Sequence, residues 1–199
     1  MFRLQIVRVG ALASVLWLGT WSVGAQTEPP LVFVLAGQSN MVDQGVTAEL
    51  TADQMITPPN VTYLMETGET GLFDRVRFGP EVSLVPRLAQ EWPDRELIFV
   101  KHAVGGTSLL AWEPEWDAAR AELTRNAEVG PLYTQLIAIL DRHELRGEAE
   151  IGAVFWMQGE SDAFDYSAAH GYHDNLSVFM EALQNDLGIH GMPVVAGLI

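Results

Sequence analysis

Three short polar clusters in the chain each follow an apolar run. They are Gly-Gln-Ser-Asn at 37–40, Gly-Gly-Thr-Ser at 105–108 and Gln-Gly-Glu-Ser-Asp at 158–162. A serine hydroxyl can attack a carbonyl carbon, and paired glycines let backbone N–H groups approach an anion. A side-chain amide beside a carboxylate can donate and accept hydrogen bonds. These groups together form the inventory of an acyl-transfer site.

Ser39 lies shortly after the apolar run at 31–35. Its pattern is not the G-x-S-x-G nucleophile elbow, because residue 41 is methionine. A serine where a strand passes into a helix can be a nucleophile, since the free N–H groups at the start of the helix can face a developing anion. It can also be a helix N-cap, which is the commoner role of serine at such a position. Ser39 alone leaves both roles open and favours the cap.

The other two clusters also have plain structural alternatives. Gly105 and Gly106 can present N–H donors to an oxyanion, or they can form an ordinary turn. Gln158 can donate its amide N–H to an anion, and Glu160 can orient a histidine or bind a polar group. Glu160 can instead form an ion pair with an arginine or with Lys101, the only lysine of the chain.

The elements that must position these clusters follow an alternating pattern of strands and helices. Apolar runs predict strands at 31–36, 61–65, 96–102, 151–157 and 193–198. Helical patterns between them predict parallel strands joined by crossover helices, with strands buried on both faces. The three clusters then follow three separate strands of one sheet, so they meet at one edge of it.

The helices are marked by prolines and by apolar spacing. Pro86 is expected to open a helix at 85–91, and Pro131 a longer one. A further apolar stripe at 172–187 predicts a helix that ends at Gly188. The segments 40–60 and 103–130 show no clean period and predict long loops, which are often functional in a compact α/β domain.

The first 25 residues have the layout of a secretory signal peptide. Arg3 and Arg8 flank a positive start, residues 9–25 are almost uncharged, and small residues precede Gln26. A membrane anchor is the competing interpretation. Cleavage leaves one domain at 26–199, secreted or periplasmic, with no membrane association.

The composition limits the partners. The net charge of −15 becomes −17 without the two early arginines, because residues 1–25 hold no acid. Such acidity excludes nucleic acid as an expected partner, whereas neutral sugars stay open. The chain has no cysteine, so disulfides and thiolate chemistry are excluded.

The clusters in their order along the chain resemble a known family. GQSNM at 37–41, Lys101 through GGTSL at 105–109 with Trp112, and WMQGESD at 156–162 are similar to the sialate O-acetylesterase-like branch of the SGNH hydrolases. This branch includes the acetylxylan esterases of carbohydrate esterase family six. The resemblance implies a flavodoxin-like three-layer α/β/α sandwich with a mostly parallel sheet. It also implies hydrolysis of O-acetyl esters on carbohydrates, with no cofactor and no metal.

The resemblance assigns roles to the predicted site residues. Ser39 matches the nucleophile, and its N–H, that of Gly106 or Gly105, and the Gln158 side chain match the oxyanion hole. Glu160 matches an acid that organises the site and can partner a catalytic histidine.

The same resemblance predicts the substrate contacts. The acetylated carbohydrate is expected to touch Asn40, Gly105, Thr107 and Trp112. Trp112 and Trp116 are candidates for stacking on a sugar, and packing inside the long loop is the equal alternative.

The general base is the departure from the family pattern. The family carries it in a late D-x-x-H motif, and none of the five histidines here follows an aspartate by three residues. The last residues, PVVAGLI at 193–199, form an apolar strand, which is an unusual terminus. We therefore expect the SGNH-type domain to be incomplete, with the D-x-x-H segment beyond Ile199.

Two rival functions stay open. The chain can be a carbohydrate-binding protein that keeps the pocket but lacks the general base. A proton-transfer or lyase site with Glu160 as its base is the weakest alternative, since it leaves Ser39 without a role.

Overall fold

A computed structural model describes residues 28–66, 68–73, 75–147 and 149–197. The predicted signal peptide at 1–25 lies outside the described residues. The main sheet has six strands in the order β4-β3-β6-β1-β7-β8. Their bounds are β1 Leu31–Gly37, β3 Val61–Met65, β4 Gly68–Glu69, β6 Leu97–Ala103, β7 Glu150–Met157 and β8 Val194–Ala196. Two short strands, β2 Gly45–Val46 and β5 Arg77–Phe78, form a separate antiparallel pair.

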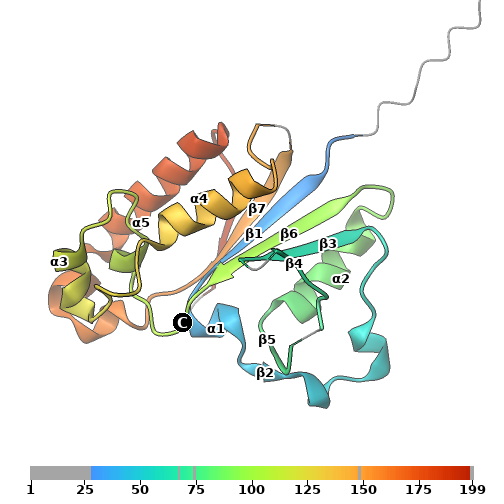
Figure 1. The fold of residues 1–199 in the computed structure, drawn as a ribbon, viewed down its shortest axis with the longest axis horizontal. Coiled ribbons are helices and arrows are strands. Elements are labelled where there is room, and N and C mark those ends of the chain that lie inside the picture. Colours follow the sequence, from blue (N-terminus) through green and yellow to red (C-terminus); the bar gives the residue numbers. More distant parts are fainter. Residues whose placement is uncertain (1–27, 67, 74, 148, 198–199) are drawn as a thin grey trace, which may run out of the picture.

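Helices cover both faces of the main sheet (Figure 1). The α-helices are α1 Ser39–Val42, α2 Glu81–Glu91, α3 Ala118–Ala121, α4 Leu132–Arg142 and α5 Tyr166–Leu187. Short 3₁₀ helices lie at Thr47–Glu49, Ala52–Met55, Leu109–Trp112, Glu122–Thr124 and Asp162–Phe164. Helices α4 and α5 lie on one face, and α2 lies on the other (Figure 1). The predicted three-layer α/β/α architecture is confirmed. No described helix is long and apolar enough to cross a bilayer.

The topology places a ligand crevice at the end of β1. All main-sheet pairings are parallel except that of β4 with β3. The order β6-β1-β7-β8 corresponds to 2-1-3-4 of the flavodoxin-like arrangement, and β3 extends the sheet outside β6. After β1 the chain thus forms β3, β4 and finally β6 on one side of β1, and it then adds β7 and β8 on the other side. Open α/β sheets bind ligands at such a switch point.

Strand β1 shows why the apolar runs are continuous. Val32, Val34 and Ala36 pack into the cluster formed with α4 and α5. Leu31, Phe33 and Leu35 belong to the opposite cluster, which includes residues of α2. Because both faces are covered, the alternation of side chains buries every residue of the strand.

The helix predictions are confirmed in part. Pro131 immediately precedes α4, and α5 ends at Gly188, whose φ of 68° is the left-handed conformation of a helix C-cap. The prediction that Pro86 opens a helix is wrong. Helix α2 begins at Glu81, and Pro86 lies inside it. Its buried side chains lie on both sides of the proline, with Val85 before it and Ala89 after it, so burial outweighs the lost hydrogen bond.

Candidate active site

Gly37 joins three strand ends directly before the serine. Its carbonyl accepts a hydrogen bond from Val104 N–H at 3.1 Å, and the next N–H, of Gln38, donates to the Met157 carbonyl at 2.9 Å. A Cβ at Gly37 would lie 2.1 Å from the Met157 oxygen, and φ is 146°. Only glycine fits this close approach in this conformation. The ends of β1, β6 and β7 are therefore fixed together at the residue that precedes Gln38 and Ser39.

Ser39 is the first residue of α1 and not its cap. The N-cap is Gln38, and its side chain makes no capping hydrogen bond. The Ser39 hydroxyl is half-buried and has no hydrogen-bond partner among the described residues. The N-cap alternative is therefore wrong, and the hydroxyl is free to meet a ligand.

The paired glycines lie beside this serine. A Cβ placed on Gly105 would be 3.8 Å from Ser39 Cβ, so the second cluster abuts the first. Gly105 and Gly106 are exposed, and Gly106 has a φ of 72° with open space around it. Within the described residues, the N–H groups of Ser39, Gly105 and Gly106 have no hydrogen-bond acceptor. These N–H groups are available to an anion at Ser39.

Glu160 connects the third cluster to the first. Its Oε1 accepts a hydrogen bond from Asn40 Nδ2 at 2.5 Å, and Ser161 Oγ donates to Gln38 Oε1 at 3.1 Å. The Oε2 atom of Glu160 is buried and has no partner in the described part of the chain. The alternative ion pair with Lys101 is wrong, because Lys101 pairs with Glu81 at 2.7 Å.

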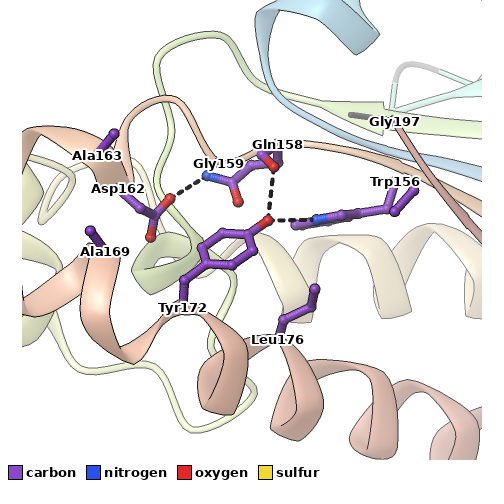
Figure 2. A pocket seen from close by; sticks show the side chains of 10 residues that line it. Trp156, Gln158, Gly159, Asp162, Ala163, Ala169, Tyr172, Leu176 and Gly197 are labelled. Atoms are coloured by element: carbon purple, nitrogen blue, oxygen red, sulfur yellow. Dashed lines mark hydrogen bonds between the residues drawn. The ribbon is translucent and has the colours of Figure 1, made fainter. Parts of the chain in front are cut away.

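Gln158 is held differently from the predicted oxyanion donor. Its Nε2 donates to the Thr107 carbonyl at 2.9 Å and to Asp162 at 2.5 Å, as Figure 2 shows in part. Both amide hydrogens are thereby used inside the protein. The prediction that this side chain donates to an oxyanion is corrected: Gln158 ties the third cluster to the second, and its Oε1 is buried without a described partner.

Asp162 is a residue of this network that the sequence prediction missed. Its side chain is 1% exposed and accepts hydrogen bonds from Leu109 N–H at 3.0 and 3.1 Å. Burial raises its pKa, and the hydrogen bonds from Gln158 and Leu109 oppose this rise. The available signal was an acid that ends a polar cluster directly after a buried strand. Asp162 fixes the segment that follows the paired glycines.

Two predicted substrate contacts are corrected. Thr107 and Trp112 are both 0% exposed. The Thr107 hydroxyl donates to the Val104 carbonyl at 2.8 Å, and the Trp112 ring packs edge-on against Trp156. Neither side chain presents a surface to a substrate. Trp116 is partly buried against Gly130, so packing is also its role in this structure.

The five histidines are either packed elsewhere in the fold or exposed. His102 is buried against Trp112, and burial lowers its pKa. His143 caps the end of α4, while His170, His173 and His190 are exposed. Within the described residues, none of them is hydrogen-bonded to Ser39 or Glu160.

A cavity of about 370 Å³ adjoins the third cluster on another side (Figure 2). Its wall is mostly apolar and is lined by Trp156, Gln158, Gly159, Asp162, Ala163, Ala169, Tyr172, Leu176, Ala196 and Gly197. Ser39 and the paired glycines do not line it, so it is distinct from the surface at the serine. No group of three or more potential metal ligands occurs in the part of the chain that the structure describes.

Comparisons with known proteins agree on one group. The family model described as "SASA: Carbohydrate esterase, sialic acid-specific acetylesterase" matches residues 29–199. A relative named probable carbohydrate esterase, from Arabidopsis thaliana, is 26% identical over 191 residues. That alignment covers 84% of this chain and 68% of the relative.

Three solved structures share the fold. One is of an Arabidopsis thaliana protein, with a TM-score of 0.65, 22% identity and coverage of 84% of this chain and 73% of that one. A carbohydrate acetylesterase from Xanthomonas citri gives a TM-score of 0.59, 17% identity and coverage of 83% and 40%. NanS gives a TM-score of 0.59 at 16% identity, and the match covers 86% of this chain and 68% of that one. At these identities the likeness establishes the fold.

Proposed function

Since the chain belongs to the carbohydrate esterase family of sialic acid-specific acetylesterases, we propose that it hydrolyses O-acetyl esters of carbohydrates with Ser39 as the nucleophile. The observation that carries this proposal is the contact between Ser39 and the paired glycines. An unpaired hydroxyl at the end of β1 lies next to Gly105, where exposed backbone N–H groups have no acceptor in the described structure. This arrangement suits an attack on a carbonyl group whose oxygen becomes negative.

The reaction has two steps. Ser39 Oγ loses its proton to a base and attacks the acetyl carbonyl carbon; the ester C–O bond then breaks, and the sugar hydroxyl leaves with a proton. Water attacks the acetyl-serine, and acetate is released. The N–H groups of Ser39 and of Gly106 or Gly105 would hold the oxyanion in both steps, each contributing on the order of 2.7–4 kcal/mol.

Glu160 supports the proposal through Asn40, the residue that follows the serine. Its Oε1 is held by Asn40, which follows Ser39, and its Oε2 is buried with no described partner. A buried carboxylate oxygen that accepts no hydrogen bond costs folding free energy, so a base with an N–H group would be stabilised by donating to it. Glu160 is thus proposed to orient the general base and Asn40 to orient Glu160.

The test is the serine itself. Ser39→Ala is expected to remove p-nitrophenyl acetate hydrolysis by the chain, because the other hydroxyls beside the paired glycines, of Thr107 and Ser108, are buried and hydrogen-bonded within the protein. Added imidazole supplies a base from solution, so it should raise the rate of the wild type above that of the variant. Equal rates for both proteins, with and without imidazole, would show that Ser39 is not the nucleophile.

The second candidate function is carbohydrate binding without catalysis. It is favoured by one observation: none of the described histidines is hydrogen-bonded to Ser39. Calorimetric binding of acetylated xylo-oligosaccharides or acetylated sialic acid, with no Ser39-dependent acetate release, would support it. Acetate release from the same panel of glycans would instead identify the sugar that the esterase prefers.

A further inference from the structure

Lys101 is the only lysine of the chain, and its side chain is 1% exposed. A lysine is almost never fully buried unless it is paired. Its Nζ lies 2.7 Å from Glu81 Oε2, and Glu81 is also buried, with a side chain 5% exposed. Burial lowers the pKa of Lys101, and the neighbouring Glu81 charge opposes this. The proposed reaction uses neither charge, so the pair needs another explanation.

The contacts of the pair lead to helix α1. Lys101 Nζ also donates to the Val42 carbonyl at 2.7 Å, and Val42 is the last residue of α1. Glu81 Oε1 accepts a hydrogen bond from Gly79 N–H at 2.9 Å. A Cβ on Gly79 would lie 2.3 Å from the Met41 carbonyl oxygen. The pair and Gly79 therefore enclose the last two carbonyl groups of the helix.

Helix α1 needs such support because it cannot hold itself. It has four residues, and its N-cap makes no side-chain hydrogen bond. Helices shorter than about 12 residues are marginal in water. The position of α1, and of its first residue Ser39, is therefore set by tertiary contacts at its two ends. At its N-terminus the contact is the strand junction at Gly37, and at its C-terminus it is the hydrogen bond from Lys101 to Val42.

We propose that the buried Lys101–Glu81 pair is a positioning device that holds α1 so that Ser39 stays beside Gly105. Lys101 supplies the donor to Val42, and Glu81 keeps the ammonium group in place while it binds the adjoining Gly79. This inference rests on the proposed function, because the placement of α1 matters for chemistry only if Ser39 reacts.

The test removes both charges together. A single substitution would leave an unpaired buried charge and destabilise the protein for that reason alone. The double variant Lys101→Met with Glu81→Gln avoids this, and the glutamine keeps an acceptor for Gly79. The matched control is Arg87→Met with Glu91→Gln, which removes an exposed ion pair of 2.7 Å on α2, whose side chains are 70% and 51% exposed.

Hydrogen exchange and serine labelling report the result. The amides of Met41, Val42 and Asp43 are hydrogen-bonded within or beside α1. In the double variant they should exchange about tenfold faster, because α1 loses the hydrogen bond that Lys101 Nζ donates to the Val42 carbonyl. The amides of β1 should keep their protection, because the β1–β6 ladder does not use the side chains of the pair. Labelling of Ser39 by a fluorophosphonate should slow about tenfold, because a loosened α1 no longer holds the Ser39 hydroxyl beside Gly105. The control should match the wild type in both.

Wild-type exchange at α1 together with wild-type labelling in the double variant would overturn the inference. If wild-type Ser39 does not react with the fluorophosphonate, the proposed function fails, and the exchange measurement still decides the role of the pair. Should the double variant not fold, Glu81→Asp is informative, because it keeps both charges and only shortens the acid by one methylene group. It holds Lys101 less closely without leaving a charge unpaired, so exchange must rise at α1 more than at β1, and an equal rise at both contradicts the inference.

Discussion

At the scale of single residues, the site depends on how buried polar groups are satisfied. Gln158 uses both amide hydrogens on Thr107 and Asp162, and Asp162 in turn accepts from Leu109. The side chain that resembles an oxyanion donor therefore fixes the segment that follows the paired glycines. The backbone N–H groups of Ser39 and the glycines are left as the donors that face outward.

Asp162 gives a pH prediction. Because burial raises its pKa, the folded protein binds this proton more tightly than the unfolded chain does. The contribution of protonated Asp162 to stability is full below its ordinary pKa of 3.8 and is lost as the pH rises through the raised folded value. The unfolding free energy of the wild type relative to Asp162→Asn should therefore fall as the pH rises from about 4.

Urea unfolding of both proteins at several pH values measures this difference. Asp165→Asn is the matched control, because Asp165 caps α5 through Ala168 N–H and asparagine is an equally good cap. A difference between the wild type and Asp162→Asn that does not change with pH would contradict the prediction.

The residues of the site were predictable to different degrees. Ser39, Gly105 and Glu160 follow strands of one sheet, so their meeting at one edge follows from topology. The burial of Thr107 and Trp112 was not predictable, because the direction of a side chain in an aperiodic loop depends on distant neighbours. Lys101, in a buried strand, requires an acidic partner, but no local pattern shows that the partner is Glu81.

At the scale of elements, the five predicted strands match β1, β3, β6, β7 and β8 within about one or two residues, since apolar runs covered on both faces leave little ambiguity. The two-residue strands β2, β4 and β5 were not predicted, because they are too short to show a pattern. The residue at which a helix begins is harder to predict, because Pro86 was expected to open α2 and lies inside it. The sequence has two prolines, Pro80 and Pro86, that could each mark the start of a helix, and the structure uses Pro80, the N-cap of α2. Which proline marks the start of the helix depends on which side chains pack against the sheet, and only the tertiary structure determines that packing.

Gly37→Ala tests the junction of β1, β6 and β7. The added methyl group would overlap the Met157 carbonyl, so we expect a loss of about 3 kcal/mol or more in unfolding free energy. Gly188→Ala is the control, because Gly188 also has a positive φ but has no atom within 4 Å of the added Cβ. It should lose about 1 kcal/mol from backbone strain alone. Similar losses in the two variants would mean that the junction does not constrain β1.

At the scale of the whole molecule, the charge of −15 at pH 7 separates the two proposed substrate classes. An acetylated sialic acid carries a carboxylate and is repelled by an acidic protein, whereas acetylated xylan is neutral. Raising the ionic strength from about 0.01 to 0.15 M shortens the screening length from about 30 to 8 Å. The KM for the sialate ester should therefore fall about threefold, while that for the xylan ester stays constant. Equal salt responses of the two KM values would show that net charge does not influence substrate choice.

The enclosed ammonium group of Lys101 also affects how the protein can be handled. Reagents that acylate amines normally modify many surface lysines and give mixed products. Here the single lysine of residues 1–199 is shielded by Glu81 and by the Val42 carbonyl of α1. Acylation of amines should therefore leave the described residues unmodified for as long as they stay folded.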